Sequence, residues 1–183
     1  MIILNFTFND KPTQQRIQLA LEQFTNGKTA NDKTVGLFLE LQWTYRTMQQ
    51  QYDQLLGQFH LSESQFIILM FLEEAPNHAH LPSELADQLG SSRATITKLV
   101  NHMQKDGLVV KQHSKVDKRS VAIQITAQGS LFLKAFLPKN FEAVNTIMDN
   151  LSADEVQQLF LLLQKVKQGT QNLKQEMELT HDE

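Results

Sequence analysis

Basic side chains are concentrated between Ser91 and Arg119, a segment with seven lysines and arginines and only two acidic residues. It carries +5, whereas the whole chain, with 17 Lys+Arg and 20 Asp+Glu, carries −3, which leaves −8 for the rest. An acidic chain with one basic segment is typical of a protein that binds a polyanion at one place. The candidate DNA-contacting residues are Ser91, Ser92, Arg93, Ala94, Thr95, Lys98, Asn101, Lys115, Asp117, Lys118 and Arg119.

The chemistry of these side chains suits a DNA groove. Lys98 can donate to guanine O6 and N7, and Asn101 can pair with adenine through two hydrogen bonds. Arg93 and the hydroxyls beside it suit phosphates, helped by the positive end of a helix dipole. Ala94 leaves room for a thymine methyl group. The alternative is that this basic face is only solvated surface.

The segment 91–105 has the spacing of an amphipathic helix. Ile96, Leu99, Val100 and Met103 follow the i, i+3, i+4, i+7 pattern, which places them on one apolar face. Ser91 or Ser92 can cap its first turn, and a glycine at 107 suits the left-handed position that ends a helix. The polar and basic residues above therefore occupy the opposite face.

The elements around this helix predict a helix-turn-helix followed by a wing. Pro82 opens a short helix over 83–89, and Gly90 ends it immediately before the basic helix. After residue 107, an apolar run over 108–110 and alternation at 121, 123 and 125 predict a two-stranded ribbon. Residues 78–80, which include two histidines, are interpreted as a loop.

Three longer helices flank this region, at 34–59, 126–150 (with Pro138 inside it) and 152–177. The first and the last have apolar residues at heptad spacing, which is typical of helix–helix interfaces. Ser62 with Gln65, and Ser152 with Glu155, are predicted capping boxes. The expected organisation is a 1–33 N-terminal extension with room for a short helix, a helical dimerisation region at 34–60 and 126–178, and a winged helix-turn-helix at 61–125.

The sequence argues against several other classes of protein. It has no cysteine, which excludes disulfides and thiolate metal sites, and its longest apolar run, 66–72, is far too short to span a bilayer. The six histidines are scattered and predict no metal site. No catalytic motif is present, so we expect neither enzyme activity nor a cofactor. The expected location is the cytoplasm, without membrane association.

Aromatic residues on the first long helix raise a second possibility, a ligand pocket. The expected lining combines apolar rings with one cation suited to an anionic ligand. The alternative is that these aromatic residues fill the core and the helix interfaces. The candidate pocket residues are Trp43, Arg46, Tyr52, Phe66 and Met70.

Six short motifs follow one another along the central part of the chain. They are Leu85-Ala86, Leu89-Gly90, Thr95–Val100, Lys105–Val109, Asp117–Ser120 and Thr126–Gly129. Together they resemble the multiple-antibiotic-resistance regulator (MarR) family of winged-helix transcription factors, over roughly residues 34–177. The expected fold class is therefore mainly α with a small β-wing, a winged helix-turn-helix flanked by long N- and C-terminal dimerisation helices.

The resemblance implies a function as well as a fold. It implies a homodimer that reads a pseudo-palindromic double-stranded DNA operator, with one helix in each major groove. It also implies a repressor released by a small aromatic, acidic or lipidic effector. The alternative function is a winged-helix module that contacts protein and does not bind DNA specifically.

The family's wing signature, Asp-x-Arg followed by a small residue, stands here as Asp117, Arg119 and Ser120. It implies that Arg119 enters the minor groove, where a narrow groove enhances the negative potential. We interpret Asp117 as orienting Arg119 through a charge-assisted hydrogen bond. Lys115 and Lys118 add sequence-independent attraction to phosphates.

Overall fold

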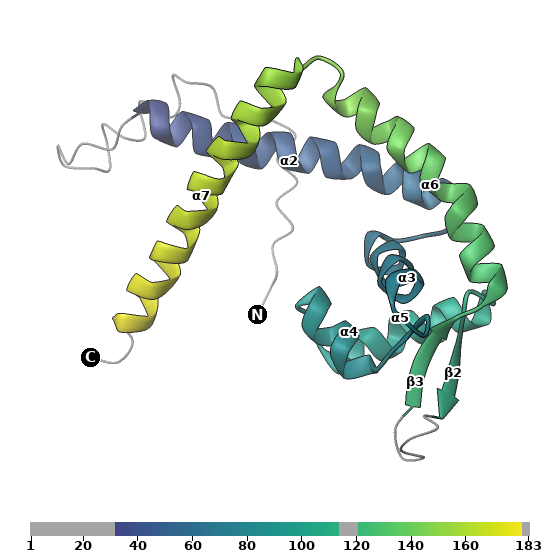
Figure 1. Cartoon of the computed structure of the whole chain (residues 1–183). Helices are drawn as coiled ribbons and strands as arrows, with labels where there is room; N and C mark the ends of the chain where they lie inside the picture. Colours follow the sequence, from purple (N-terminus) through teal and green to yellow (C-terminus); the bar gives the residue numbers. More distant parts are fainter. Residues whose placement is uncertain (1–31, 114–120, 181–183) are drawn as a thin grey trace. The chain divides into compact units, whose positions relative to one another are not determined.

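A computed structural model describes residues 32–113 and 121–180 (Figure 1). The chain divides into two compact units, with the boundary between Thr126 and Ala127. The first long helix and the winged helix-turn-helix lie in the first unit. The expected dimerisation region at 34–60 and 126–178 stays a prediction. The expected extension over 1–33 lies outside the described residues, except for its last two positions.

In the first unit, α2 (Asp32–Gln58) confirms the first long helix, predicted at 34–59, and α3 (Glu63–Glu74) follows it. The capping box at the start of α3 is formed as expected: Ser62 Oγ accepts from Gln65 N–H, and Gln65 Oε1 accepts from Ser62 N–H. Ile68, Leu69 and Leu72 of α3 are fully buried in the core. Helix α3 therefore forms the centre on which the winged helix-turn-helix packs.

The helix-turn-helix consists of α4 (Pro82–Leu89) and α5 (Arg93–Lys105). Gly90, at φ 59°, adopts the left-handed conformation that allows the tight turn between them. On α5, Ile96, Val100 and Met103 are buried, which confirms the predicted apolar face. Gly107 has φ 74°, again as predicted for the end of this helix.

A three-stranded antiparallel sheet completes the first unit, with strand order β1-β3-β2. Strands β2 (Val109–His113) and β3 (Val121–Ile125) pair from Val109 opposite Ile125 onward, and they form the base of the predicted wing (Figure 1). Strand β1 (Ala79–His80) pairs with β3 through Ala79 opposite Gln124. The interpretation of residues 78–80 as a loop was therefore wrong, because two residues form a strand too short for any alternation to show.

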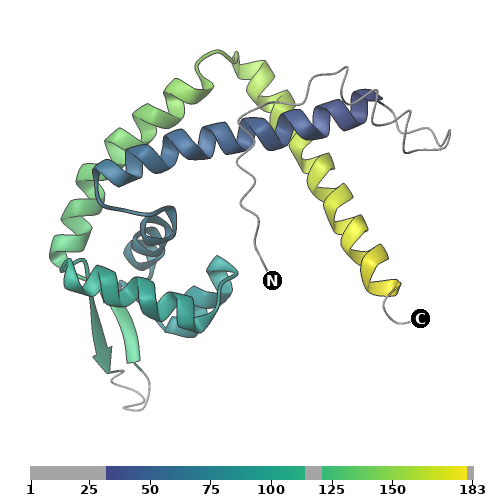
Figure 2. The ribbon, with the colours of Figure 1, turned by 180° about the vertical axis from the view of Figure 1, so that it is seen from behind.

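The second unit contains α6 (Ala127–Met148) and α7 (Ala153–Leu179), which Figure 2 shows from behind. Helix α6 includes Pro138, as expected. Helix α7 begins with the predicted capping box, in which Glu155 accepts from Ser152 N–H at 2.8 Å. No residue of α7 is buried. Its heptad stripe of apolar side chains is therefore exposed in the single chain.

Candidate nucleic-acid interface

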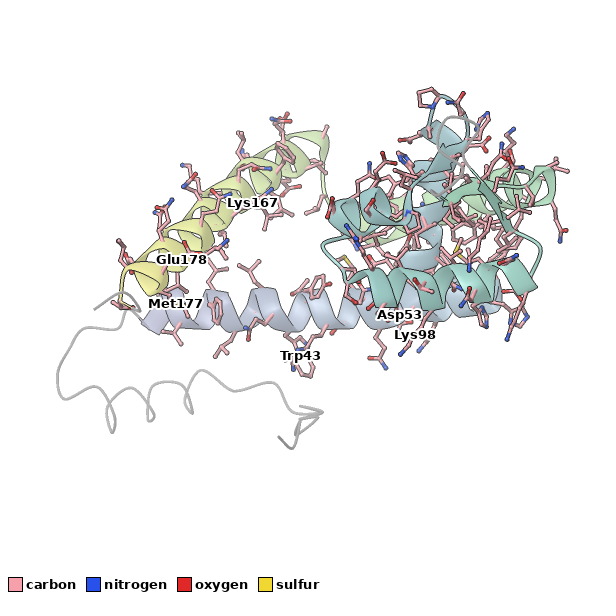
Figure 3. All side chains as sticks on the ribbon, turned by 90° about the horizontal axis from the view of Figure 1, so that it is seen from below. Trp43, Asp53, Lys98, Lys167, Met177 and Glu178 are labelled. Atoms are coloured by element: carbon pink, nitrogen blue, oxygen red, sulfur yellow. The ribbon has the colours of Figure 1, made fainter. Side chains whose placement is uncertain are left out.

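The outer face of α5 presents the predicted polar and basic residues to solvent. Arg93, Ala94, Lys98 and Asn101 are all exposed, opposite the buried apolar face of the same helix. Figure 3 labels Lys98 on this helix. The amphipathic pattern read from the sequence thus positions these side chains as expected. No described residue covers the face enough to bury any of them.

Hydroxyl groups organise the first turn of α5. Ser92 is the N-cap: its Oγ accepts from Thr95 N–H at 3.1 Å and lies 2.9 Å from Thr95 Oγ1. Ser91 is half-buried. Because residues 92–95 are exposed, the positive end of the α5 dipole lies at the surface, where it favours an anion such as a phosphate.

Asn101 has a partner that the sequence did not suggest. Lys111 Nζ, on β2, donates a 2.6 Å hydrogen bond to Asn101 Oδ1. The carbonyl oxygen that a two-bond contact with adenine requires is therefore engaged by the wing strand in the free protein. Lys111 was absent from the predicted site residues, because no local spacing links positions 101 and 111.

The remaining predicted site residues lie between the end of β2 and the start of β3. Lys115, Asp117, Lys118 and Arg119 all fall within residues 114–120, outside the described residues. Their roles stay predictions. The described strands pair as far as His113 opposite Val121.

The two histidines near β1 have carboxylate neighbours that sequence reasoning overlooked. His80 Nδ1 lies 3.1 Å from Glu84 Oε2, and His78 Nδ1 lies 4.0 Å from Glu73 Oε2. The hydrogen bond from Leu81 N–H, with a further contribution from His80, lowers the pKa of Glu84. These are paired contacts and do not converge, and the described residues contain no group of three or more histidine or acidic side chains that could hold a metal ion.

Two cavities in the first unit bear on the ligand hypothesis. A depression of about 500 Å³ is lined by α2 alone, and of the five expected pocket residues only Arg46 lines it. A smaller cavity of about 230 Å³ lies between α4, α5 and the wing strands. Its lining, which the sequence did not predict, is Pro82, Ile96, Thr97, Val100, Lys111, Val121 and Ile123.

The other expected pocket residues are partly buried. Trp43, Tyr52, Phe66 and Met70 are each half-buried. Burial, and to a smaller extent the nearby charge of Glu63, raises the pKa of Tyr52. These side chains therefore contribute to packing, as the alternative interpretation of the aromatic residues allowed.

Within the described part of the chain, no single helix is long and apolar enough to cross a membrane. Helices α2 and α3, with a bend of 68° between them, have the length and composition of a membrane span only when they are taken together.

Comparison with known proteins finds that the chain is similar to transcriptional regulators. A family model described as MarR family matches residues 61–120. The HTH-type transcriptional repressor YetL of Bacillus subtilis is 40% identical over 95 residues, which cover 52% of this chain and 57% of YetL. The transcriptional repressor MprA of Escherichia coli is 31% identical over 116 residues, which cover 63% of this chain and 66% of MprA. The chain thus spans less than two thirds of the length of either relative.

A solved structure shows the same fold. Sco3205, a MarR family transcriptional regulator from Streptomyces coelicolor crystallised in complex with DNA, matches with a TM-score of 0.67 and 22% identity. The match covers 77% of this chain and 88% of Sco3205. This confirms the predicted winged helix-turn-helix with flanking helices.

Proposed function

The chain belongs to the MarR family, and from this premise we propose that it is a sequence-specific DNA-binding regulator of transcription that acts as a homodimeric repressor. Its partner is double-stranded DNA with a pseudo-palindromic operator, which matches the two-fold symmetry of a dimer. YetL and MprA, the relatives described above, are transcriptional repressors. The protein works in the cytoplasm, where it reaches this DNA.

The observation that supports the proposal most is the exposed outer face of α5. It combines Arg93, Lys98 and Asn101 with a capped helix N-terminus, directly after the tight turn at Gly90. In a helix-turn-helix the second helix enters the major groove and its outer side chains reach base edges. Lys98 then suits guanine, and Arg93 suits a phosphate near the helix start.

The wing completes the proposed interface. Arg119, with Asp117 orienting it, is assigned to the minor groove beside the site read by α5. Lys115 and Lys118 add contacts to phosphates, which strengthen binding to any sequence. The assignment of Arg119 comes from the family resemblance of the wing signature, and those of Asp117, Lys115 and Lys118 come from the chemistry of their side chains.

Homodimerisation is supported by the exposed apolar stripe of α7. Val156, Leu159, Leu163, Val166 and Leu173 repeat at heptad spacing and are all at least 36% exposed in the single chain. A stripe of this kind marks an interaction surface, because exposed apolar area of this extent is unfavourable in water. A second copy of the same helix is the occupant that two-fold symmetry supplies.

Release by a small effector is the remaining part of the proposal. An aromatic, acidic or lipidic molecule would need apolar walls and a cation. The residues proposed from the sequence offer Arg46 as the cation, on the same helix as the partly buried rings of Trp43 and Tyr52. Such a ligand would lower DNA affinity by favouring a dimer geometry in which the two α5 helices no longer match successive major grooves.

Binding to a labelled duplex at increasing salt tests the function. A DNA-binding protein loses affinity steeply, with a log–log slope of about −0.9 for each phosphate neutralised. A flat response would instead support the alternative, a winged-helix module that contacts protein.

A pair of charge-matched variants localises the interface. Lys98→Met and Lys167→Met each remove one exposed positive charge, from α5 and from α7 respectively (Figure 3). We expect Lys98→Met to weaken DNA binding by about 1–3 kcal/mol and Lys167→Met to leave it unchanged. Equal effects would mean that α5 is not the reading element.

A further inference from the structure

Gln65 is a buried polar side chain in the first turn of α3, with 6% of its surface exposed. Its Oε1 accepts hydrogen bonds from Ser62 N–H at 2.9 Å and from Ser62 Oγ at 3.1 Å. An amide nitrogen can only donate, so the capping box fixes which end of the amide faces Ser62. The NH₂ group of Gln65 therefore points away from the cap.

That NH₂ group contacts α5. Gln65 Nε2 lies 3.2 Å from Nδ1 of His102, in the last turn of α5. Because Nε2 is a donor, Nδ1 is the acceptor and the ring carries its hydrogen on its own Nε2. A single buried amide thus joins the start of α3 to the end of α5.

His102 Nδ1 has a second neighbour, Asp106 Oδ2, at 3.1 Å. A carboxylate only accepts, so it pairs with Nδ1 only when that nitrogen carries a hydrogen, and Gln65 then has no acceptor there. The two contacts exclude each other. Only the Gln65 contact joins two helices, because Asp106 directly follows α5 in the chain.

The Gln65–His102 bond supplies a direction that apolar packing lacks. The buried face of α5 consists of Ile96, Val100 and Met103, whose packing is non-directional. A hydrogen bond requires a defined geometry and so restricts rotation of the helix about its axis. Lys98 precedes His102 by four residues, which places the two on the same side of α5. Fixing His102 therefore fixes where Lys98 points.

We propose that Gln65 is a positioning residue for DNA recognition, which acts through His102 to set the rotation of α5 against the base edges. The inference rests on the proposed function, since it has consequences only if α5 reads DNA. It deepens that function by assigning specificity in part to a buried residue that touches no DNA.

Two substitutions at His102 separate positioning from stability. The residue is 64% exposed, so His102→Ala removes the acceptor without opening a core cavity. His102→Asn restores an acceptor, because asparagine Oδ1 is separated from the backbone by the same number of bonds as histidine Nδ1. Alanine leaves the buried Gln65 NH₂ group without its acceptor, which costs more stability than the higher helix propensity of alanine returns, so binding of both variants is measured well below their melting temperatures.

The readout is the ratio of affinity for an operator to affinity for a random duplex, with an operator enriched from a random pool by the wild-type protein. We expect His102→Ala to lower this ratio about threefold to tenfold, the effect of one hydrogen bond, and His102→Asn to keep it within about twofold of wild type. The ratio compares two duplexes bound by the same folded variant, so a change in stability alone does not alter it. A His102→Ala ratio equal to wild type overturns the proposal, and so does an equal loss in both variants, because the ring itself would then contact the DNA.

A double-mutant cycle tests the part played by Gln65. Gln65→Met removes the NH₂ group and also the side-chain half of the capping box, so its melting temperature falls, and binding is measured well below that temperature. We expect the ratio to fall as in His102→Ala, with no further fall when both changes are combined. If the fold-losses of the two single variants multiply in the double variant, Gln65 and His102 act independently and the proposed link is overturned. If the wild-type chain shows no preference for an operator over a random duplex, the proposed function is refuted as well. If the wild type and the variants all prefer the operator to the same extent, this inference alone is refuted.

Discussion

Lys111 Nζ on β2 donates a 2.6 Å hydrogen bond to Asn101 Oδ1 on α5. The bond joins the two elements that the proposed function assigns to the major groove and to the minor groove. Because both side chains are exposed, its contribution to overall stability is small. Its consequence is geometric, since it holds the base of the wing against the outer face of α5.

Removing this bond should weaken recognition more than the loss of a charge alone. We compare Lys111→Met with Lys105→Met, which removes an exposed lysine from the end of α5. Both variants should bind every duplex more weakly, because each has lost a positive charge. Only Lys111→Met should lose a further 0.5–1.5 kcal/mol, roughly, of binding free energy for the operator. Competition binding with operator and random duplexes measures the difference. Indistinguishable variants would mean that the bond does not act in recognition.

Arg119→Ala tests the assignment of the wing. The minor-groove role predicts a loss of about 1–3 kcal/mol in operator binding, with the melting temperature nearly unchanged. Lys118→Ala is the neighbouring control and should weaken operator and random duplexes alike, since a phosphate contact carries no sequence information. A large fall in melting temperature for Arg119→Ala would show instead that the arginine is structural.

The α7 stripe predicts the oligomeric state. Sedimentation at micromolar concentration should give a mass of about twice the 21.0 kDa of one chain. Replacing Leu159 and Leu163 by glutamate places charges in the stripe and should shift the mass toward that of a single chain. The same number of charges introduced at Gln157 and Gln164 serves as the control. A wild-type mass near 21.0 kDa contradicts the homodimer.

Glu84 predicts part of the acid sensitivity. Its pKa lies below the ordinary 4.5, because Leu81 N–H and His80 stabilise the carboxylate. The stability that this group contributes is therefore fully present above pH 4.5 and is lost as the pH falls from 4.5 through the lowered pKa. Glu84→Gln keeps an acceptor for Leu81 but does not titrate, so its melting temperature should fall less over this range. If the melting temperatures of the wild type and Glu84→Gln fall equally with pH, the Glu84 carboxylate does not contribute to stability.

The features predicted correctly from the sequence depend on residues close together in the chain. The capping box of Ser62 with Gln65 and the turn at Gly90 each involve a few consecutive positions, whose chemistry largely determines the local backbone. The apolar face of α5 follows from the helical period. The exposed position of Lys98 follows in turn, because it lies opposite that face.

The features that were missed depend on distant residues. Strand β1 forms because Ala79 pairs with Gln124 of β3. A segment of two residues has no sequence pattern from which this pairing could be predicted. The bonds from Lys111 to Asn101 and from Gln65 to His102 depend on how helices and strands pack, which the local sequence pattern does not determine. The capping role of Gln65 was predicted, whereas the hydrogen bond from its NH₂ group to His102 was not.

Selection of DNA from a random pool by the purified full chain tests the central claim most directly. A homodimer with one α5 in each major groove should enrich an inverted repeat whose half-sites are centred about 10 base pairs, or roughly 34 Å, apart. Lys98→Met should lose the preference at a symmetric pair of positions. A pool that shows no enriched motif, or only a single unrepeated half-site, would contradict the account.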